Sequence, residues 1–223
     1  MEPINSSHYP ASRAANVAEN YINYKMGTPH QLFERQQVTS ASKESIAGVG
    51  NKYHLTFSIK DTLNKEPEIK STAEVLYYSD KSCPPDVKFT LQTKPRNSTA
   101  AKDLEFYTRM INNKQPLVAE ELPDKFGNVA PDMEPVRNLG IAAAGFVKWK
   151  NATEGTLYSM TVIKKVEQQM RDDTALEFHY SLLIHEMVTQ EMIPFQMEVT
   201  WNPTEGLKIK NQKRLPKSNS EEN

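Results

Sequence analysis

The chain has 223 residues, of which 38% are hydrophobic and 25% are charged, and its formal net charge at pH 7 is -1. This composition predicts a folded, soluble, globular protein, and the small net charge excludes a long-range electrostatic field that would attract nucleic acid or an anionic membrane. The length permits one large domain or two of about 100 residues each, and we expect two.

The sequence also bears on cellular location. No apolar run approaches the roughly 18 residues that a membrane-spanning helix needs, and the first ten residues lack the charged start and apolar middle of a secretory signal. Cys83 is the only cysteine, so no disulfide can form within the chain, as is usual in a reducing compartment. We therefore expect a cytoplasmic protein without membrane or nucleic-acid partners.

The first half of the chain predicts a helix followed by strands. Apolar residues recur at helical spacing over residues 10–26, with Pro10 suited to the first turn and Gly27 to the end of the helix. Asn20 and Asn23 are expected on its polar face. Apolar and polar residues then alternate, which is typical of strands with one buried face. The inward positions are Tyr53, Leu55, Phe57 and Ile59, then Ala73, Val75 and Tyr77, then Val87, Phe89 and Leu91.

A linker is predicted over residues 96–131, between one unit of residues 1–95 and another of residues 132–223. Residues 101–111 have a helical apolar stripe, and residues 115–131 are expected to be extended. A linker with its own apolar stripe indicates that the two halves are docked against each other.

The second half repeats this pattern. A helix is expected to begin at Asp132 as its N-cap, with Pro135 in its first turn, and Gly140 and Gly145 indicate close packing, with the first helix as the candidate neighbour. Its buried stripe is Val136, Leu139, Ala143, Phe146 and Val147. The inward strand positions are Leu176, Phe178, Tyr180, Leu182 and Ile184, then Met197, Val199 and Trp201, then Leu207 and Ile209.

The two halves are related by an offset of 125 residues. FVKWKNATEGTLYSM, residues 146–160, aligns with YINYKMGTPHQLFER, residues 21–35, and the same offset relates Tyr53 to Phe178. Short connections predict antiparallel hairpins, and each amphipathic helix can cover the apolar face of its sheet. The predicted fold class is α+β: two tandem units, each one helix packed on a four-stranded antiparallel sheet, joined by a helical linker.

No pattern in the sequence predicts catalysis. The chain has no Gly-x-Ser-x-Gly nucleophile elbow, no phosphate-binding loop and no His-Glu-x-x-His run, and Cys83 lies in a proline-rich turn unsuited to a catalytic thiol. His179 and His185, with Glu177 and Glu186 nearby, come closest to a metal-ligand cluster, but solvent-facing histidines are the preferred interpretation. We expect no enzyme activity, no metal and no cofactor.

Two resemblances indicate the function. The segment ESIAG, residues 44–48, is similar to the Gln-x-Val-x-Gly hairpin of cystatins, which block cysteine proteases, except that Glu44 replaces glutamine and Ile46 replaces valine. A helix followed by four strands is the order of the cystatin fold, so both units resemble cystatins. More specifically, the chain resembles the latexin family, vertebrate inhibitors of A/B-type zinc metallocarboxypeptidases. The segments that carry this resemblance are residues 9–30, 52–55, 72–77, 126–129, 189–194 and 214–217.

The second resemblance implies tight, reversible, non-covalent inhibition of A/B-type metallocarboxypeptidases by a chain that is monomeric when free, with loops seated over the active-site funnel. It implies partner contacts at the strand end and hairpin turn formed by His185, Glu186, Thr189, Gln190 and Glu191, against the simpler interpretation of a solvated turn. The polar tail, residues 217–223, is expected to be dispensable. The alternatives are inhibition of papain-type cysteine proteases through residues 44–48, or a non-inhibitory interaction protein.

Overall fold

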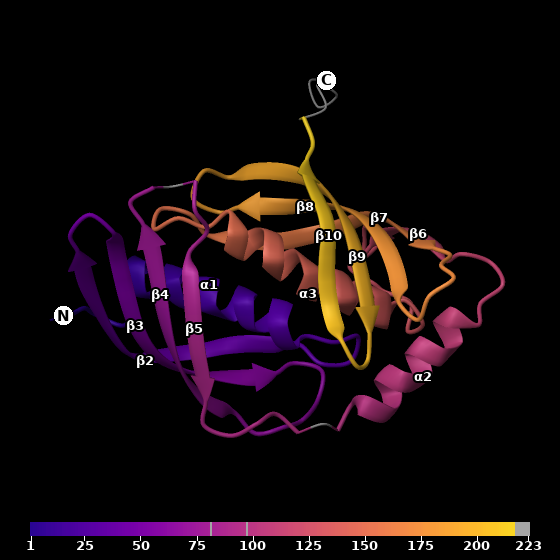
Figure 1. Ribbon diagram of the computed structural model, residues 1–223, viewed down its shortest axis with the longest axis horizontal. Helices are drawn as coiled ribbons and strands as arrows, with labels where there is room; N and C mark the ends of the chain where they lie inside the picture. Colours follow the sequence, from indigo (N-terminus) through magenta and orange to yellow (C-terminus); the bar gives the residue numbers. More distant parts are fainter. Residues whose placement is uncertain (81, 97, 217–223) are drawn as a thin grey trace.

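A computed structural model describes residues 1–80, 82–96 and 98–216, so the polar tail lies outside the described residues. The elements in chain order are β1 (Glu2–Pro3), α1 (Tyr9–Met26), β2 (Phe33–Ile46), β3 (Gly50–Asp61), β4 (Ile69–Tyr78), β5 (Asp86–Leu91), α2 (Ala100–Ile111), β6 (Val118–Leu122), α3 (Glu134–Lys150), β7 (Tyr158–Gln169), β8 (Leu176–Glu186), β9 (Glu191–Asn202) and β10 (Gly206–Arg214). Figure 1 shows α1 and α3 in the middle of the molecule and α2 at its periphery.

The strands form two antiparallel sheets, in the orders β1-β2-β3-β4-β5 and β10-β9-β8-β7-β6. This is the α+β arrangement of two tandem units, each with one helix on an antiparallel sheet, that the sequence predicts, except that each sheet has five strands instead of four. The additional strands are short and lie at sheet edges: β1 pairs with β2, and β6 pairs with β7. Because β6 lies within residues 96–131, part of the predicted linker belongs to the second sheet. The division into three parts stays a prediction.

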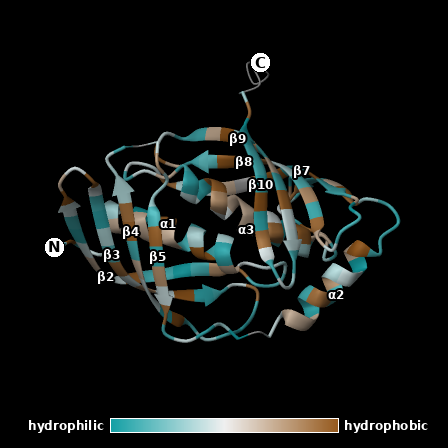
Figure 2. Ribbon diagram, in the orientation of Figure 1, coloured by the Kyte–Doolittle hydropathy of each residue, from teal (hydrophilic) through white to brown (hydrophobic). Residues whose placement is uncertain are grey.

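Helices α1 and α3 each cover the apolar face of the sheet in their own half of the chain. Figure 2 shows hydrophobic and hydrophilic residues alternating along the strands, as expected for sheets with one buried face. The first core contains Ile22, Phe57 and Val75, and the second contains Leu139, Phe178 and Trp201. No helix in the described ranges is both long and apolar enough to span a membrane.

The two helices pack closely against each other, as Gly145 predicted. Gly140 instead faces the sheet, where an added Cβ would lie 2.7 Å from Ile163 and 2.9 Å from Tyr180. A Cβ atom added to Gly145 would lie 2.5 Å from the backbone oxygen of Asn20, and one added to Gly27 would lie 2.8 Å from the Cβ of Ala142. Both distances are shorter than a normal contact, so the helices can approach this closely only because these positions are glycines.

Two expectations for the helices are wrong. Asn20 and Asn23 were placed on a polar face, but they are 3% and 7% exposed, because α3 covers this side of α1 and because Asn23 fixes the start of β2. The Asn23 amide donates to the backbone oxygen of Phe33 at 2.7 Å and accepts from its N–H at 2.9 Å. Helix α3 begins at Glu134 with Met133, not Asp132, at the N-cap.

An aromatic cluster joins the halves with internal two-fold character. Tyr21 contacts Trp149 with ring centroids 4.8 Å apart, and Tyr24 contacts Phe146 at 4.9 Å. The 125-residue offset relates Tyr21 to Phe146 and Tyr24 to Trp149, so each contact is the counterpart of the other. Tyr21 and Phe146 are only half-buried, and their rings pack between the units.

Glu154, in the loop between α3 and β7, is a second connection between the halves. Its carboxylate accepts hydrogen bonds from the Tyr53 hydroxyl at 2.6 Å, the Asn51 amide at 2.9 Å and the Lys43 ammonium at 3.1 Å. Burial raises the pKa of Glu154, but these hydrogen bonds outweigh burial and hold the pKa below its usual value. A charged side chain from the second half is thus bound by the first sheet, and the two halves are docked as predicted.

Candidate functional site

The candidate site is the turn between β8 and β9, formed by Met187, Val188, Thr189 and Gln190. The strands remain paired up to Glu186 and Glu191, so the turn is short. Gln190 has a φ of +60°, which is uncommon for a residue other than glycine, and its side-chain amide donates to the Met187 oxygen at 2.5 Å. The turn therefore has a defined conformation.

Glu186 braces this turn from within. Glu186 is 4% exposed, and its carboxylate accepts four hydrogen bonds. Oε1 accepts from the N–H groups of Leu157 at 2.9 Å and Val188 at 3.1 Å, and Oε2 accepts from the Thr189 N–H at 2.7 Å and hydroxyl at 2.6 Å. Burial raises the pKa of Glu186, but the hydrogen bonds prevail and lower it to about 2. The carboxylate thus ties the turn to the start of β7.

The structure brings the five predicted contact residues together but gives them different surroundings. Thr189 and Gln190 are exposed, and His185 is half-buried on the outer face of the sheet. Glu191 is partly buried and forms an ion pair with Arg214 at 2.7 Å. Glu186 points inward, so its position suits a brace instead of a partner contact. The contact role of the other four residues stays a prediction.

Three apolar residues at this hairpin were not singled out from the sequence. Met187, Val188 and Met192 are 43%, 48% and 40% exposed. Met192 lies directly across from His185 in the β8–β9 register, so the two side chains are neighbours on one face. Their apolar character at a hairpin turn could have identified them from the sequence, because such turns are usually polar.

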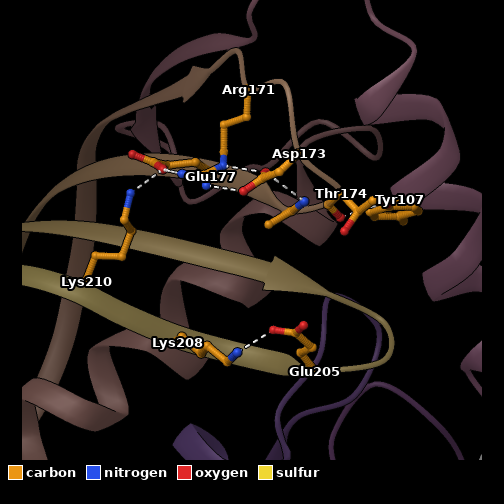
Figure 3. Close-up of polar contacts among 9 residues, drawn as sticks. Tyr107, Arg171, Asp173, Thr174, Glu177, Glu205, Lys208 and Lys210 are labelled. Carbon is orange, nitrogen blue, oxygen red and sulfur yellow. Dashed lines mark hydrogen bonds and ion pairs between the residues drawn. The ribbon is translucent and has the colours of Figure 1, made fainter.

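The outer face of the second sheet has a network of charged side chains (Figure 3). Glu177 accepts from Lys210 at 2.8 Å, from His179 at 3.1 Å and from Arg171, which also pairs with Asp173. Glu177 points outward as predicted but is only 7% exposed, because these partners cover it. Burial raises the pKa of Glu177, but the hydrogen bonds lower it to about 2.

This network contains only one of the two histidines in the suggested cluster. His179 contacts Glu177, whereas His185 lies six residues along the strand, beside the turn. The structure gathers no group of three or more His, Cys, Asp or Glu residues suited to a metal ion within the described residues.

The hairpin turn that resembles that of cystatins joins the end of β2 to the start of β3. Its turn contains Gly48, with a φ of +71°, and Glu44 lies beside His54 with 3.5 Å between carboxylate and imidazole. Val49 and Tyr78 are 38% and 37% exposed at the same end, where the Ser79 N–H donates to the Val49 oxygen at 2.8 Å. Two largely apolar side chains are thus exposed at this end of the first sheet.

The comparison with known proteins covers both halves. A family model described as Latexin matches residues 4–219. The chain belongs to the latexin family. Mouse Latexin is 46% identical over 98% of this chain and 99% of its own length, and human Latexin is 46% identical over 96% and 97%. Chicken Ovocalyxin-32 is 30% identical over 94% of this chain and 76% of its own. Since the match to the latexin family includes both sheets and α2, the shared unit is the two-unit molecule.

Proposed function

We propose that this chain is a tight, reversible inhibitor of A/B-type zinc metallocarboxypeptidases and that the β8–β9 hairpin is its principal contact. The observation that carries the proposal is the nearly end-to-end match to the latexin family, a resemblance that implies protease inhibition. The chain supplies no catalytic residue in this function, because a folded protein that covers the active site stops the enzyme by excluding substrate.

The geometry of the turn supports this mode of inhibition. The target peptidases bind a free peptide C-terminus in a closed pocket beneath their zinc, whereas the hairpin presents a continuous chain with no free end. The Glu186 carboxylate and the Gln190 amide fix the turn before binding. Less conformational entropy is therefore lost on association, and the backbone resists the distortion that cleavage requires.

A larger surface than the turn is needed. A standard tight interface buries about 1,600 Å² in total, more than four turn residues can supply. The loop between α3 and β7 is a suitable addition, because the Met187 N–H donates to the Leu157 oxygen at 2.8 Å and Glu154 in the same loop connects to the first sheet. The docked halves thus present the turn on a rigid base.

A titration of carboxypeptidase A with the purified chain tests the proposal. We expect activity to fall in proportion to added protein until the two are equimolar, and to recover on dilution. A chain that leaves the activity unchanged at a tenfold molar excess would contradict the proposal and favour a non-inhibitory interaction protein. A Leu63→Ala variant should inhibit as well as the unaltered chain, because it changes the corresponding hairpin of the first half and not the proposed contact.

Inhibition of papain-type proteases is the second candidate function. It is favoured by the exposed Val49 and Tyr78 next to the segment that resembles the cystatin hairpin. The charge of Glu44, where cystatins have a neutral amide, opposes it. We expect papain to retain its activity in the same titration, and a Glu44→Gln variant that gains papain inhibition would identify this charge as the reason.

A further inference from the structure

The β8–β9 hairpin has two exposed methionines. The chain contains nine methionines, and among the described residues Met187 and Met192 are 43% and 40% exposed, whereas Met110 and Met197 are each 2% exposed. Exposure controls how readily a thioether reacts with a dissolved oxidant. Met187 and Met192 are therefore open to oxidation while the core methionines are protected.

Both residues lie next to the predicted contact residues. Met187 is the first residue of the turn, and its backbone is fixed on both sides by the Leu157 oxygen and the Gln190 amide. Met192 lies across from His185 on the outer face. A peptidase that covers Thr189 and Gln190 also covers these two side chains, because no more than two residues separate either methionine from Thr189 or Gln190 along the hairpin.

We propose that Met187 and Met192 form an oxidation site through which a peroxide weakens peptidase binding. The inference rests on the proposed function, because it concerns the surface that the peptidase would cover. In the reaction, the thioether sulfur attacks one oxygen of hydrogen peroxide, an S–O bond forms, the O–O bond breaks, and water leaves. The sulfur is oxidised to a sulfoxide and the peroxide is reduced.

The physical effect follows from the change in polarity. A methionine side chain gains from burial in an interface, whereas a sulfoxide must lose its hydration and needs a hydrogen-bond donor that an apolar contact does not provide. We expect each buried sulfoxide to raise the dissociation constant about tenfold or more. The change is reversible, since methionine sulfoxide reductases restore the thioether.

Met170 provides a matched control within the same sheet. It is 54% exposed, so it reacts as readily, but it follows the last residue of β7, at the opposite end of the strand from the candidate turn. At about 3.3 Å per residue, this twelve-residue strand separates Met170 from the turn by roughly 35 Å. Oxidation of Met170 therefore leaves the proposed contact surface unchanged.

The experiment uses the full chain with Cys83→Ser, because Cys83 is exposed and also reacts with peroxide. The protein is treated with hydrogen peroxide, the peroxide is removed with catalase, each sulfoxide is quantified by peptide mass spectrometry, and the dissociation constant for carboxypeptidase A is measured. The same procedure is applied to Met187→Leu/Met192→Leu and to Met170→Leu, and each variant is compared with itself before and after treatment.

We expect the parent and the Met170→Leu variant to lose affinity by tenfold or more as Met187 and Met192 become oxidised, and to regain it after treatment with the reductases. The Met187→Leu/Met192→Leu variant should keep its own starting affinity. Unchanged affinity of the parent with both residues oxidised overturns the inference but not the proposed function. An equal loss in the double variant also overturns it. If the untreated chain does not inhibit, both proposals fail together.

Discussion

The β3–β4 and β8–β9 hairpins occupy equivalent places in the two halves and have the same internal brace. Asp61 ends β3 and is 5% exposed, and Glu186 ends β8 and is 4% exposed. The carboxylate of Asp61 accepts from the N–H groups of Leu63 and Asn64 at 3.0 and 3.2 Å, as Glu186 accepts from its own turn. A buried carboxylate thus lies at both positions, which the 125-residue offset relates to each other.

The two hairpins differ in what they connect. The loop of the first is longer and is tied to its surroundings: the Asn64 amide donates to the His30 oxygen at 2.9 Å, and the Gln31 amide donates to Asp61 at 3.0 Å. The His30 imidazole lies 2.8 Å from the Asp103 carboxylate of α2. The short second turn presents exposed Met187 instead. The same brace thus supports a linker attachment in one half and the proposed contact in the other.

A substitution that forces α1 and α3 apart should affect both hairpins and cause the largest loss of stability. Gly145→Leu places a side chain where a Cβ already lies 2.5 Å from the Asn20 oxygen, so we expect a loss of about 3 kcal/mol in the free energy of unfolding, the upper end for overpacking. Thermal unfolding monitored by circular dichroism measures it. Gly155→Leu is the control, since the nearest atom to its added Cβ is 3.9 Å away, and equal melting temperatures for both variants would contradict the prediction.

Isosteric changes at the two braces should separate stability from inhibition. Glu186→Gln and Asp61→Asn each place an amide N–H against backbone donors, so we expect each to cost about 2 kcal/mol of unfolding free energy. Glu186→Gln should also weaken carboxypeptidase A inhibition by at least tenfold, whereas Asp61→Asn should not. Urea unfolding and inhibition titrations provide the two measurements, and equal losses of inhibition would show that the first hairpin contributes to binding.

Truncation of the exposed side chains at the tip of the β8–β9 hairpin should weaken binding without changing stability. Thr189→Ala/Gln190→Ala removes exposed side chains from the proposed contact, and we expect about a tenfold weaker complex, because interface truncations commonly cost on the order of 1 kcal/mol. The control Thr62→Ala/Leu63→Ala changes the corresponding tip. If inhibition fell for the control and not for the first variant, the contact would have to be moved to the β3–β4 hairpin.

The pH dependence of the second brace should be absent near neutral pH and confined to acid. The pKa of Glu186 is lowered from 4.5 to about 2 in the folded chain, so its contribution to stability is complete above pH 4.5 and is lost as pH falls toward 2. The difference in unfolding free energy between the parent and Glu186→Gln should therefore be constant from pH 5 to 8 and shrink below pH 4.5. A difference independent of pH down to 2 would show that the charge of Glu186 does not stabilise the fold.

The sequence located the helices and the strands β3, β4, β5, β8, β9 and β10, because their burial follows a regular period. It did not locate β2 or β7, because register shifts interrupt the alternation in both strands. It did not predict β1 or β6, since a short edge strand is fixed by backbone pairing and has no alternating pattern. The hairpin was located through resemblance. The inward position of Glu186 continues the alternation of Leu182 and Ile184, whereas the backbone N–H groups that bond to it depend on the conformation of the turn. The burial of Asn20 and Asn23 likewise depends on α3 and on the start of β2.

The reciprocal aromatic pairs between α1 and α3 have the geometry of an isologous contact, in which one surface meets a copy of itself. The arrangement is like that of a homodimer, except that both units belong to one polypeptide. In a symmetric pair of subunits every substitution occurs twice, so neither end can specialise alone. In a single polypeptide that restriction is absent, so one end of the molecule can present the proposed contact while the related end holds the linker.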